Sequence, residues 1–301
     1  MDFPRKKTRL FPSAAEDARS SKLNVDTPQT TSASYALSFL DTDFMMRDEL
    51  RPVRLQLELL KPEIIQTELD IASTVVIFGS ARIKDSDTAK ARLDYLKAEA
   101  EKNPDRPDMA GHLKIAQRDL DYSRYYDEAR KLARMIASAG RDADGVKCVV
   151  STGGGPGIME AANRGAHDVD AKSIGMNIVL PHEQAPNPYI TPELSFQFHY
   201  FAIRKMHFLI RAKALIAFPG GFGTMDELFE TLTLVQTKKI APMPILLFGK
   251  SFWQKVINFD ALVDAGVVSP EDLDLFHYVE TAQQGWDLLN QSDSGFSATV
   301  P

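Results

Sequence analysis

The sequence contains a single cysteine, Cys148, and it has no long uncharged apolar segment. One cysteine excludes an intrachain disulfide and a cluster of thiolates around a metal ion within one chain. Charge or glycine breaks every apolar stretch within about ten positions, whereas a membrane helix needs about 20 apolar residues. We therefore expect a protein of a reducing compartment, the cytoplasm, without a membrane-spanning helix.

The sequence also lacks an excess of positive charge, because 35 lysines and arginines stand against 41 aspartates and glutamates, which gives a formal net charge of -6. This balance argues against a nucleic-acid-binding surface, although an anion site built from backbone amides would not change the sum. Hydrophobic residues make up 44% and charged residues 25% of the 301 residues, as in an ordinary globular protein of one or two domains.

The N-terminal part of the chain differs in composition from the rest. Residues 1–35 are rich in serine, threonine, proline and charge and poor in apolar residues, so we expect a disordered tail. They lack an apolar signal core, and Glu16 and Asp17 are not typical of an organelle transit peptide. Apolar residues from Phe44 to Ile64 recur at roughly helical spacing, which predicts a helical N-terminal extension over 36–72.

Turn residues end five short apolar runs, which lie at 74–81, 147–155, 173–181, 214–221 and 244–249. Such runs are typical of strands buried on both faces of a parallel sheet, and helical patterns lie between them. We therefore predict an α/β protein over 73–290, with a Rossmann-like doubly wound parallel sheet and helices on both faces. Residues 84–121 are a charged helical insertion with a solvated face, and 291–301 are a C-terminal tail.

Two glycine-rich loops join predicted strands to predicted helices. The first, STGGGPGIMEAANRGA, contains Gly153, Gly154 and Gly155, and the second is PGGFGTMDELFE. Glycine lets backbone amides approach an anion, and the following helix adds free amides and the positive end of its dipole. Either loop alone could be a tight turn packed against a helix. The two together, with FGSAR at 78–82, favour a nucleotide-like ligand, although neither has Walker A or GxGxxG spacing.

Glu227 allows two interpretations. With Thr224 it forms a T-x-x-E pattern, in which the glutamate side chain bonds back to the residue that caps a helix. A carboxylate so close to the second glycine loop would also face the ligand crevice, and the two roles are compatible. Arg204 is equally ambiguous, because it is either a surface charge or a residue of the site.

Taken together, these segments resemble the LOG (LONELY GUY) family of cytokinin-activating phosphoribohydrolases, often labelled "lysine decarboxylase-like". PGGFGTMDE at 219–227 matches every fixed position of the family's PGGxGTxxE motif. Arg204 and Lys205 match the Arg-Lys pair upstream of it, and GGGPGIMEAANRGA looks like the family's first glycine-rich loop. The similarity spans about 73–250, and the N-terminal extension and the insertion look like the longer, type II branch.

The resemblance implies hydrolysis of the N-glycosidic bond of a nucleoside 5'-monophosphate, AMP or an N6-modified AMP such as a cytokinin riboside monophosphate, to free base and ribose 5-phosphate. Because positive charge develops on the sugar, Glu227 would stabilise it or activate water, and Arg204 would orient Glu227 and steady the anionic ligand. The expected substrate-binding residues are Ser80, Gly153, Gly154, Gly155, Glu160, Lys205, Gly220, Gly221, Gly223 and Thr224, with Asn163 as a further candidate.

The resemblance also implies a homo-oligomer, at least a dimer, and no cofactor or metal. His199 and His207 flank the Arg204 segment without further ligands at metal-binding spacing, so ordinary packing explains them better. A nucleotide-binding sensor without turnover is the main alternative function. Lysine decarboxylation is disfavoured, since no motif for a lysine that carries a cofactor is present.

Overall fold

The computed structural model describes residues 11–23, 25–104, 106–139, 141–142, 145–146, 148–181 and 185–291. The chain divides into two compact units, Met1–Glu58 and Leu59–Pro301. Most of the C-terminal tail that we expected over 291–301 lies outside the described residues. Within the described part of the chain, no helix combines the length and the apolar composition that crossing a bilayer requires.

The first unit contains short helical elements. They are α1 (Ala14–Ser20), η1 (Ser21–Leu23), η2 (Ala33–Tyr35), α2 (Thr42–Met45), η3 (Asp48–Leu50) and the start of α3 (Arg51–Glu68). Helix α1 lies in the segment for which the composition predicts disorder. Its local cause is a capping box, because the Ser13 side chain accepts from the Glu16 amide and the Glu16 carboxylate accepts from the Ser13 amide at 2.6 Å.

The second unit is built on a seven-stranded sheet in the order β6-β5-β4-β1-β7-β8-β9. All neighbouring pairs are parallel, which confirms the predicted α/β class. The strands are β1 (Ser73–Phe78), β4 (Cys148–Thr152), β5 (Ser173–Ile178), β6 (Ser195–Phe198), β7 (Ala212–Ala217), β8 (Ile245–Phe248) and β9 (His277–Val279). A separate antiparallel pair joins β2 (Arg141–Asp142) to β3 (Gly145–Val146).

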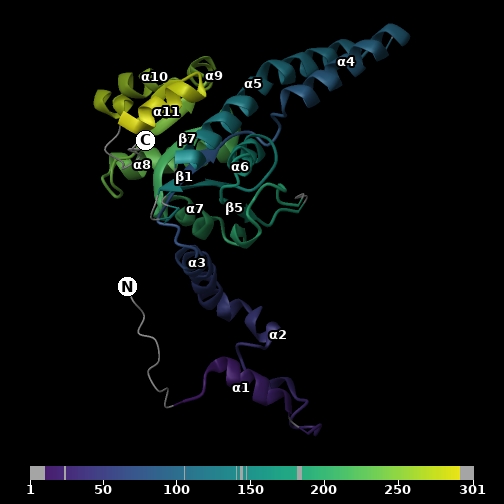
Figure 1. The fold of residues 1–301 in the computed structure, drawn as a ribbon, viewed down its shortest axis with the longest axis vertical. Coiled ribbons are helices and arrows are strands. Elements are labelled where there is room, and N and C mark those ends of the chain that lie inside the picture. Colours follow the sequence, from purple (N-terminus) through teal and green to yellow (C-terminus); the bar gives the residue numbers. More distant parts are fainter. Residues whose placement is uncertain are drawn as a thin grey trace. The chain divides into compact units, whose positions relative to one another are not determined.

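Helices cover both faces of this sheet, as predicted for a doubly wound fold (Figure 1). Alternate residues of β1 enter two different cores. Val75 and Ile77 belong to one, with residues of α5, α6 and α11, while Val76 and Phe78 belong to the other, with residues of α7, α8 and α9. The helices are α4 (Ser86–Lys102), α5 (Met109–Ala139), α6 (Ile158–His167), α7 (Phe201–Ile210), α8 (Phe222–Gln236), α9 (Lys250–Val256), α10 (Phe259–Asp264) and α11 (Ala282–Gln291), with η4 (Pro192–Leu194) and η5 (Pro270–Leu275).

The charged segment over 84–121 contains α4 and the first part of α5, which lie side by side and extend away from the sheet (Figure 1). Leu93 of α4 and Ala116 of α5 are buried. The second part of α5 packs on the sheet through residues such as Tyr126 and Leu132. One continuous helix therefore connects the insertion to the core.

The topological switch point of the sheet lies between β1 and β7, because the strand order reverses there. From β1 the chain adds β4, β5 and β6 on one side, and then returns to add β7, β8 and β9 on the other. In open parallel sheets, ligands bind beyond the carboxyl ends of the strands at such a switch point. The loops after Phe78 and Ala217 therefore flank the expected ligand crevice.

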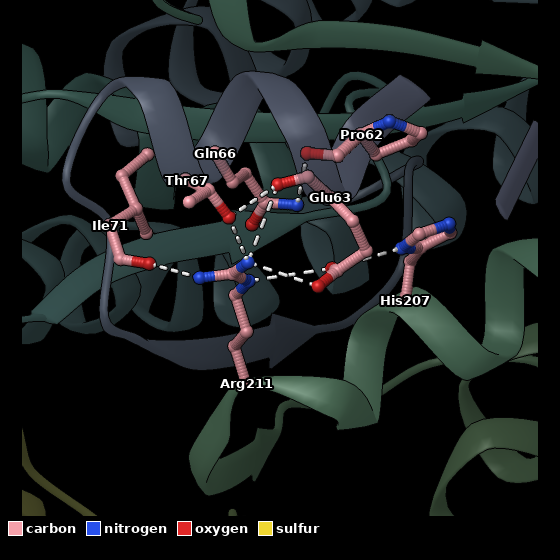
Figure 2. A network of polar contacts seen from close by, with 7 residues as sticks. All are labelled: Pro62, Glu63, Gln66, Thr67, Ile71, His207 and Arg211. Atoms are coloured by element: carbon pink, nitrogen blue, oxygen red, sulfur yellow. Dashed lines mark hydrogen bonds and ion pairs between the residues drawn. The ribbon is translucent and has the colours of Figure 1, made fainter. Parts of the chain in front are cut away.

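Arg211, which follows α7, joins this helix to the end of α3 (Figure 2). Its guanidinium donates to the Glu63 carboxylate at 3.0 Å, to the Thr67 hydroxyl at 2.9 Å and to the Ile71 carbonyl. The same carboxylate lies 3.6 Å from Nδ1 of the buried His207. Side-chain exposures of 17% for Arg211 and 29% for Glu63 indicate a partly shielded ion pair.

We expect Arg211→Met to lower the free energy of unfolding by ~2 kcal/mol, because it leaves Glu63 and the Ile71 carbonyl without their shared donor in a partly buried site. Urea denaturation measures the change. Lys213→Met, at an exposed position two residues along the chain, is the matched control and should shift stability by less than ~0.5 kcal/mol. Equal stability of the two variants would contradict the inferred contribution of this network.

Candidate active site

A pocket of about 760 Å³ lies at the switch point. Its walls come from the loops after β1 and β7, the start of α8, and parts of α5, α6, α7 and α9. Its volume falls in the range of small-molecule sites. Of the predicted site residues, the pocket brings together Ser80, Arg204, Gly220, Gly221, Gly223, Thr224 and Glu227.

The second glycine loop is open toward this pocket. Gly221 is the N-cap of α8 and provides no side chain to bond the first amides of the helix. A Cβ atom at Gly221 or Gly223 would meet no atom within 4 Å, whereas at Gly220 it would lie 2.1 Å from the Thr224 hydroxyl. Gly220 is therefore required because the Thr224 side chain packs against it. Gly221 and Gly223 leave open space beside the free backbone amides at the positive, N-terminal end of α8. This arrangement suits an anion such as a phosphate monoester.

The structure does not support a capping role for Thr224 and Glu227. Because α8 begins at Phe222, both residues lie inside the helix, and Gly221 occupies the cap position. Both side chains belong to residues only 6% exposed, and both line the pocket. The T-x-x-E pattern thus places a hydroxyl and a carboxylate on successive turns at the same ligand crevice.

Burial raises the pKa of Glu227 to about 7. Lys205 and Arg204 act in the opposite direction by favouring the carboxylate, whereas the like charges of Glu230 and Asp226 favour the protonated form. A carboxyl group with a pKa near neutrality can exchange a proton with water or substrate at physiological pH. This property distinguishes Glu227 from an ordinary surface glutamate.

Arg204 projects from α7 into the pocket and is held by several contacts. Its Nε donates to the carbonyl of Met176 at 2.7 Å, and its guanidinium carbon lies 5.0 Å from the centre of the Phe208 ring. Gly153 makes room for it, because a Cβ there would lie 2.7 Å from Nη2. The guanidinium is thus positioned before any ligand arrives.

Lys205 does not line the pocket, and its substrate-binding role stays a prediction. Its ammonium group lies 3.0 Å from the Asp226 carboxylate and 3.2 Å from that of Glu230. These two acids flank Glu227 on α8. The Arg-Lys pair therefore splits. Arg204 lines the pocket, whereas Lys205 pairs with the two flanking acids, and its positive charge lowers the pKa of Glu227.

If Glu227 acts as a base, activity should rise as the pH increases through about 7, because the base must be ionised. Lys205→Met should move this midpoint to higher pH, since it removes the positive charge that favours the carboxylate. The pH dependence of kcat/KM measures both effects. Lys255→Met, at an exposed position on α9, should leave the midpoint unchanged. A shift to lower pH in Lys205→Met would contradict this assignment.

The first glycine loop is packed rather than open. A Cβ at Gly155 would lie 2.8 Å from the Met159 methyl group, and at Gly154, where φ is +76°, it would lie 2.1 Å from the Asn177 side chain. None of Gly153, Gly154 and Gly155 lines the described pocket. Glycine at these positions makes room for Arg204, Met159 and Asn177. Contact of this loop with substrate stays a prediction.

Glu160 and Asn163 of α6 also make hydrogen bonds to other residues of the protein. Glu160 accepts a hydrogen bond from the Tyr126 hydroxyl at 2.8 Å and does not line the pocket. Asn163 is fully buried and bonds to Thr152, Ser173 and Asn187. Both side chains therefore tie α6 to its neighbours, and their contact with substrate stays a prediction.

The structure adds pocket residues that the motifs did not indicate. They include Arg118, Asp119 and Tyr122 of α5 and Phe252 of α9. Arg118, Asp119 and Tyr122 lie at the end of the charged segment or just beyond it, and their pattern resembles an ordinary solvated helix. Nothing in the local sequence distinguishes these three residues from their neighbours.

The histidines near α7 make aromatic contacts. The buried His207 ring lies 5.3 Å from that of Phe198, and the His199 ring lies 4.5 Å from that of Tyr200. Among the described residues, no group of three or more His, Cys, Asp or Glu side chains could hold a metal ion.

A second pocket of about 760 Å³ lies at the opposite, amino ends of the strands, where Ala212, Pro244 and His277 line it. Its lining contains no glycine loop and no start of a helix. The pocket at the switch point is therefore the better candidate for an anionic ligand.

The chain is similar to known proteins over its sheet-containing part. A family model described as "Possible lysine decarboxylase" matches residues 159–289. A probable cytokinin riboside 5'-monophosphate phosphoribohydrolase of Oryza sativa subsp. japonica, LOGL3, is 28% identical over 179 residues, which are 56% of this chain and 76% of that protein. The phosphoribohydrolase LOG2 of Arabidopsis thaliana is 30% identical over 149 residues, which are 48% of this chain and 65% of that protein.

Solved structures also match. The structural-genomics target TM1055 aligns with a TM-score of 0.43 at 18% identity and covers 73% of this chain and 99% of its own. A molybdenum cofactor binding protein from Rippkaea orientalis aligns with a TM-score of 0.42 at 16% identity, over 72% of this chain and 93% of its own.

Proposed function

Because the chain belongs to the LOG family, whose curated relatives are named cytokinin riboside 5'-monophosphate phosphoribohydrolases, we propose that it hydrolyses a nucleoside 5'-monophosphate to free base and ribose 5-phosphate. The substrate we propose is AMP or an N6-modified AMP such as a cytokinin riboside monophosphate. One structural observation supports this proposal most strongly. A buried carboxyl group with a pKa of about 7, Glu227, shares a pocket with the open amides of Gly221 and Gly223.

In the proposed complex, the 5'-phosphate binds at the start of α8. The free amides near Gly221 and Gly223, together with the Thr224 hydroxyl, donate hydrogen bonds to its oxygens, and the helix dipole favours its negative charge. Gly220 supports this geometry by admitting the Thr224 side chain. Ser80, from the loop after β1, faces the same pocket and would contact the ribose or the phosphate.

The reaction replaces the bond between the anomeric carbon and the base nitrogen by a bond to water oxygen. Electrons of the breaking bond move to the base, and positive charge develops on the sugar, which the Glu227 carboxylate stabilises. Glu227 accepts a proton from the attacking water, and the departing base takes up a proton from the medium. Arg204, permanently charged and fixed by Met176, orients Glu227 and holds the anionic ligand.

A product assay tests the proposal. The purified chain is incubated with AMP, N6-isopentenyl-AMP, GMP, IMP, CMP and UMP, and free base and ribose 5-phosphate are quantified. Release of both products in equal amounts from at least one monophosphate supports the proposal. Binding of a monophosphate without any release would instead support a sensor, and carbon dioxide release from lysine with pyridoxal phosphate would support decarboxylation.

We also propose that the active form is a cytoplasmic homo-oligomer, a dimer or an assembly of dimers. Apolar side chains are exposed on α7 and α8, with Phe222 at 93%, Phe201 at 51% and Met206 at 47%. Such a concentration of exposed apolar residues is typical of a protein interface. Sedimentation of the full chain that shows a monomer at micromolar concentration would contradict the oligomer.

A further inference from the structure

One wall of the pocket comes from α5, the long helix that leaves the core for the charged insertion. Arg118, Asp119 and Tyr122 line the pocket from this helix, and Phe252 lines it from α9. The rings of Tyr122 and Phe252 meet edge to face, with centroids 6.5 Å apart. This aromatic contact connects α5 to α9 and fixes the place of the Tyr122 ring.

Several of the other pocket residues already have roles in the proposed reaction. The start of α8 binds the phosphate, and Glu227 and Arg204 act at the sugar. The part of a nucleoside monophosphate without an assigned partner is the base, which has a flat aromatic face and a polar edge. The wall of Asp119, Tyr122 and Phe252 offers aromatic rings for the face and a carboxylate for the edge.

Asp119 retains capacity to accept from a ligand. Its Oδ1 accepts from the exposed Arg118 at 2.7 Å, whereas Oδ2 has a long contact of 3.5 Å with Arg92. A carboxylate offers about four lone-pair sites, so these arginines do not saturate it. The side chain is only 25% exposed, which strengthens a hydrogen bond to it relative to one on the open surface.

We propose that Asp119 and Tyr122 determine base selectivity, with Tyr122 stacking on the base and Asp119 accepting a hydrogen bond from an exocyclic amino group. This inference rests on the proposed function. A base with an amino group places a donor opposite the carboxylate, and an N6-substituted adenine still keeps one N–H. A 6-oxo purine places acceptor lone pairs there instead, so the carboxylate repels them and gains no hydrogen bond from the base.

The test compares AMP with IMP, which differ at the exocyclic position of the base. We expect the wild type to favour AMP, and Asp119→Asn to reduce the AMP/IMP ratio of kcat/KM by about 10- to 100-fold, since an amide can donate to the 6-oxo group. Asp121→Asn is the matched control, because Asp121 lies on the same helix, accepts from Gln117 and does not line the pocket. An unchanged ratio in a folded Asp119→Asn variant would overturn the proposal.

A second variant tests the stacking role. Tyr122→Ala should lower the affinities for AMP and for IMP by about tenfold. The affinity for ribose 5-phosphate should stay unchanged, because that product has no base. Tyr122→Phe should retain the wild-type affinities. Equal weakening of all three ligands by Tyr122→Ala would show a merely structural role and count against the proposal.

The selectivity of the base site can be tested even if the chain does not hydrolyse nucleotides. If no monophosphate yields ribose 5-phosphate, calorimetric dissociation constants for AMP and IMP replace kcat/KM, and the effect of Asp119→Asn on their ratio is still decisive. Failure of the hydrolase proposal is thus the absence of product. Failure of the selectivity proposal is an AMP/IMP ratio that does not respond to Asp119.

Discussion

Glu227→Gln is expected to reduce kcat by about a thousandfold, because glutamine keeps the shape of the side chain but can neither accept a proton nor supply the negative charge that stabilises the sugar. Affinity for AMP should change little, since the phosphate binds at the start of α8. Single-turnover measurement of ribose 5-phosphate gives the first quantity, and calorimetry gives the second. Nearly intact turnover would remove Glu227 from the mechanism.

The same substitution should stabilise the fold. The pKa of Glu227 is about 7 in the folded protein and ordinarily 4.5, so the folded state holds this proton more tightly than the unfolded state does. Stability from this group is therefore present below pH 4.5 and is lost as the pH rises through 7. At pH 8 Glu227→Gln should be ~2 kcal/mol more stable than the wild type, and at pH 4 the difference should disappear.

Glu230→Gln is the matched control on α8. Glu230 lies one turn along the helix, contacts Lys205 at 3.2 Å and does not line the pocket. We expect it to change kcat by less than about tenfold, through its weak influence on the charge of Glu227. A loss as large as that of Glu227→Gln would show that the whole acidic cluster, rather than one carboxylate, is needed.

Gly223→Ala is expected to weaken AMP binding by about 10- to 100-fold while it stabilises the protein slightly. The added methyl group meets no protein atom within 4 Å, so it enters the space over the amides where the phosphate would lie. Alanine is also the better helix former, which should add ~0.5 kcal/mol in the first turn of α8. Calorimetry and thermal unfolding measure the two effects.

Two other glycines make this prediction specific. Gly111→Ala adds a methyl group that also meets no atom within 4 Å, but on α5 outside the pocket, so it should stabilise without affecting affinity. Gly220→Ala should destabilise, since its Cβ would lie 2.1 Å from the Thr224 hydroxyl. Unchanged AMP affinity in Gly223→Ala would place the phosphate elsewhere.

The parallel strands were predictable because strands buried on both faces are continuous apolar runs. β1, which is buried at every position, is an example. β6 was not predicted, since only alternate residues of this edge strand are buried. The second glycine loop lies at a junction between a strand and a helix, as predicted, because it follows β7 and leads into α8.

Other parts of the site depend on tertiary contacts. A glycine that admits a ligand and a glycine that admits a neighbouring side chain are identical in the sequence. Only the structure shows that Arg204 fills the space beside Gly153. Lys205 and Arg204 are adjacent in the chain, yet they point to different groups. Asp119 reaches the pocket only because α5 continues from the insertion into the core.

The central pairing of β1 with β7 joins residues far apart in the chain, such as Val75 and Ala214. The loops after Phe78 and Ala217, which flank the ligand crevice, are brought together by this one pairing. A nascent or truncated chain that stops before β7 therefore has no crevice. Closing so long a loop is slow and entropically unfavourable. If the proposed function holds, affinity for AMP during refolding should therefore appear together with the β1–β7 pairing, and the nucleotide would report on the formation of that pairing.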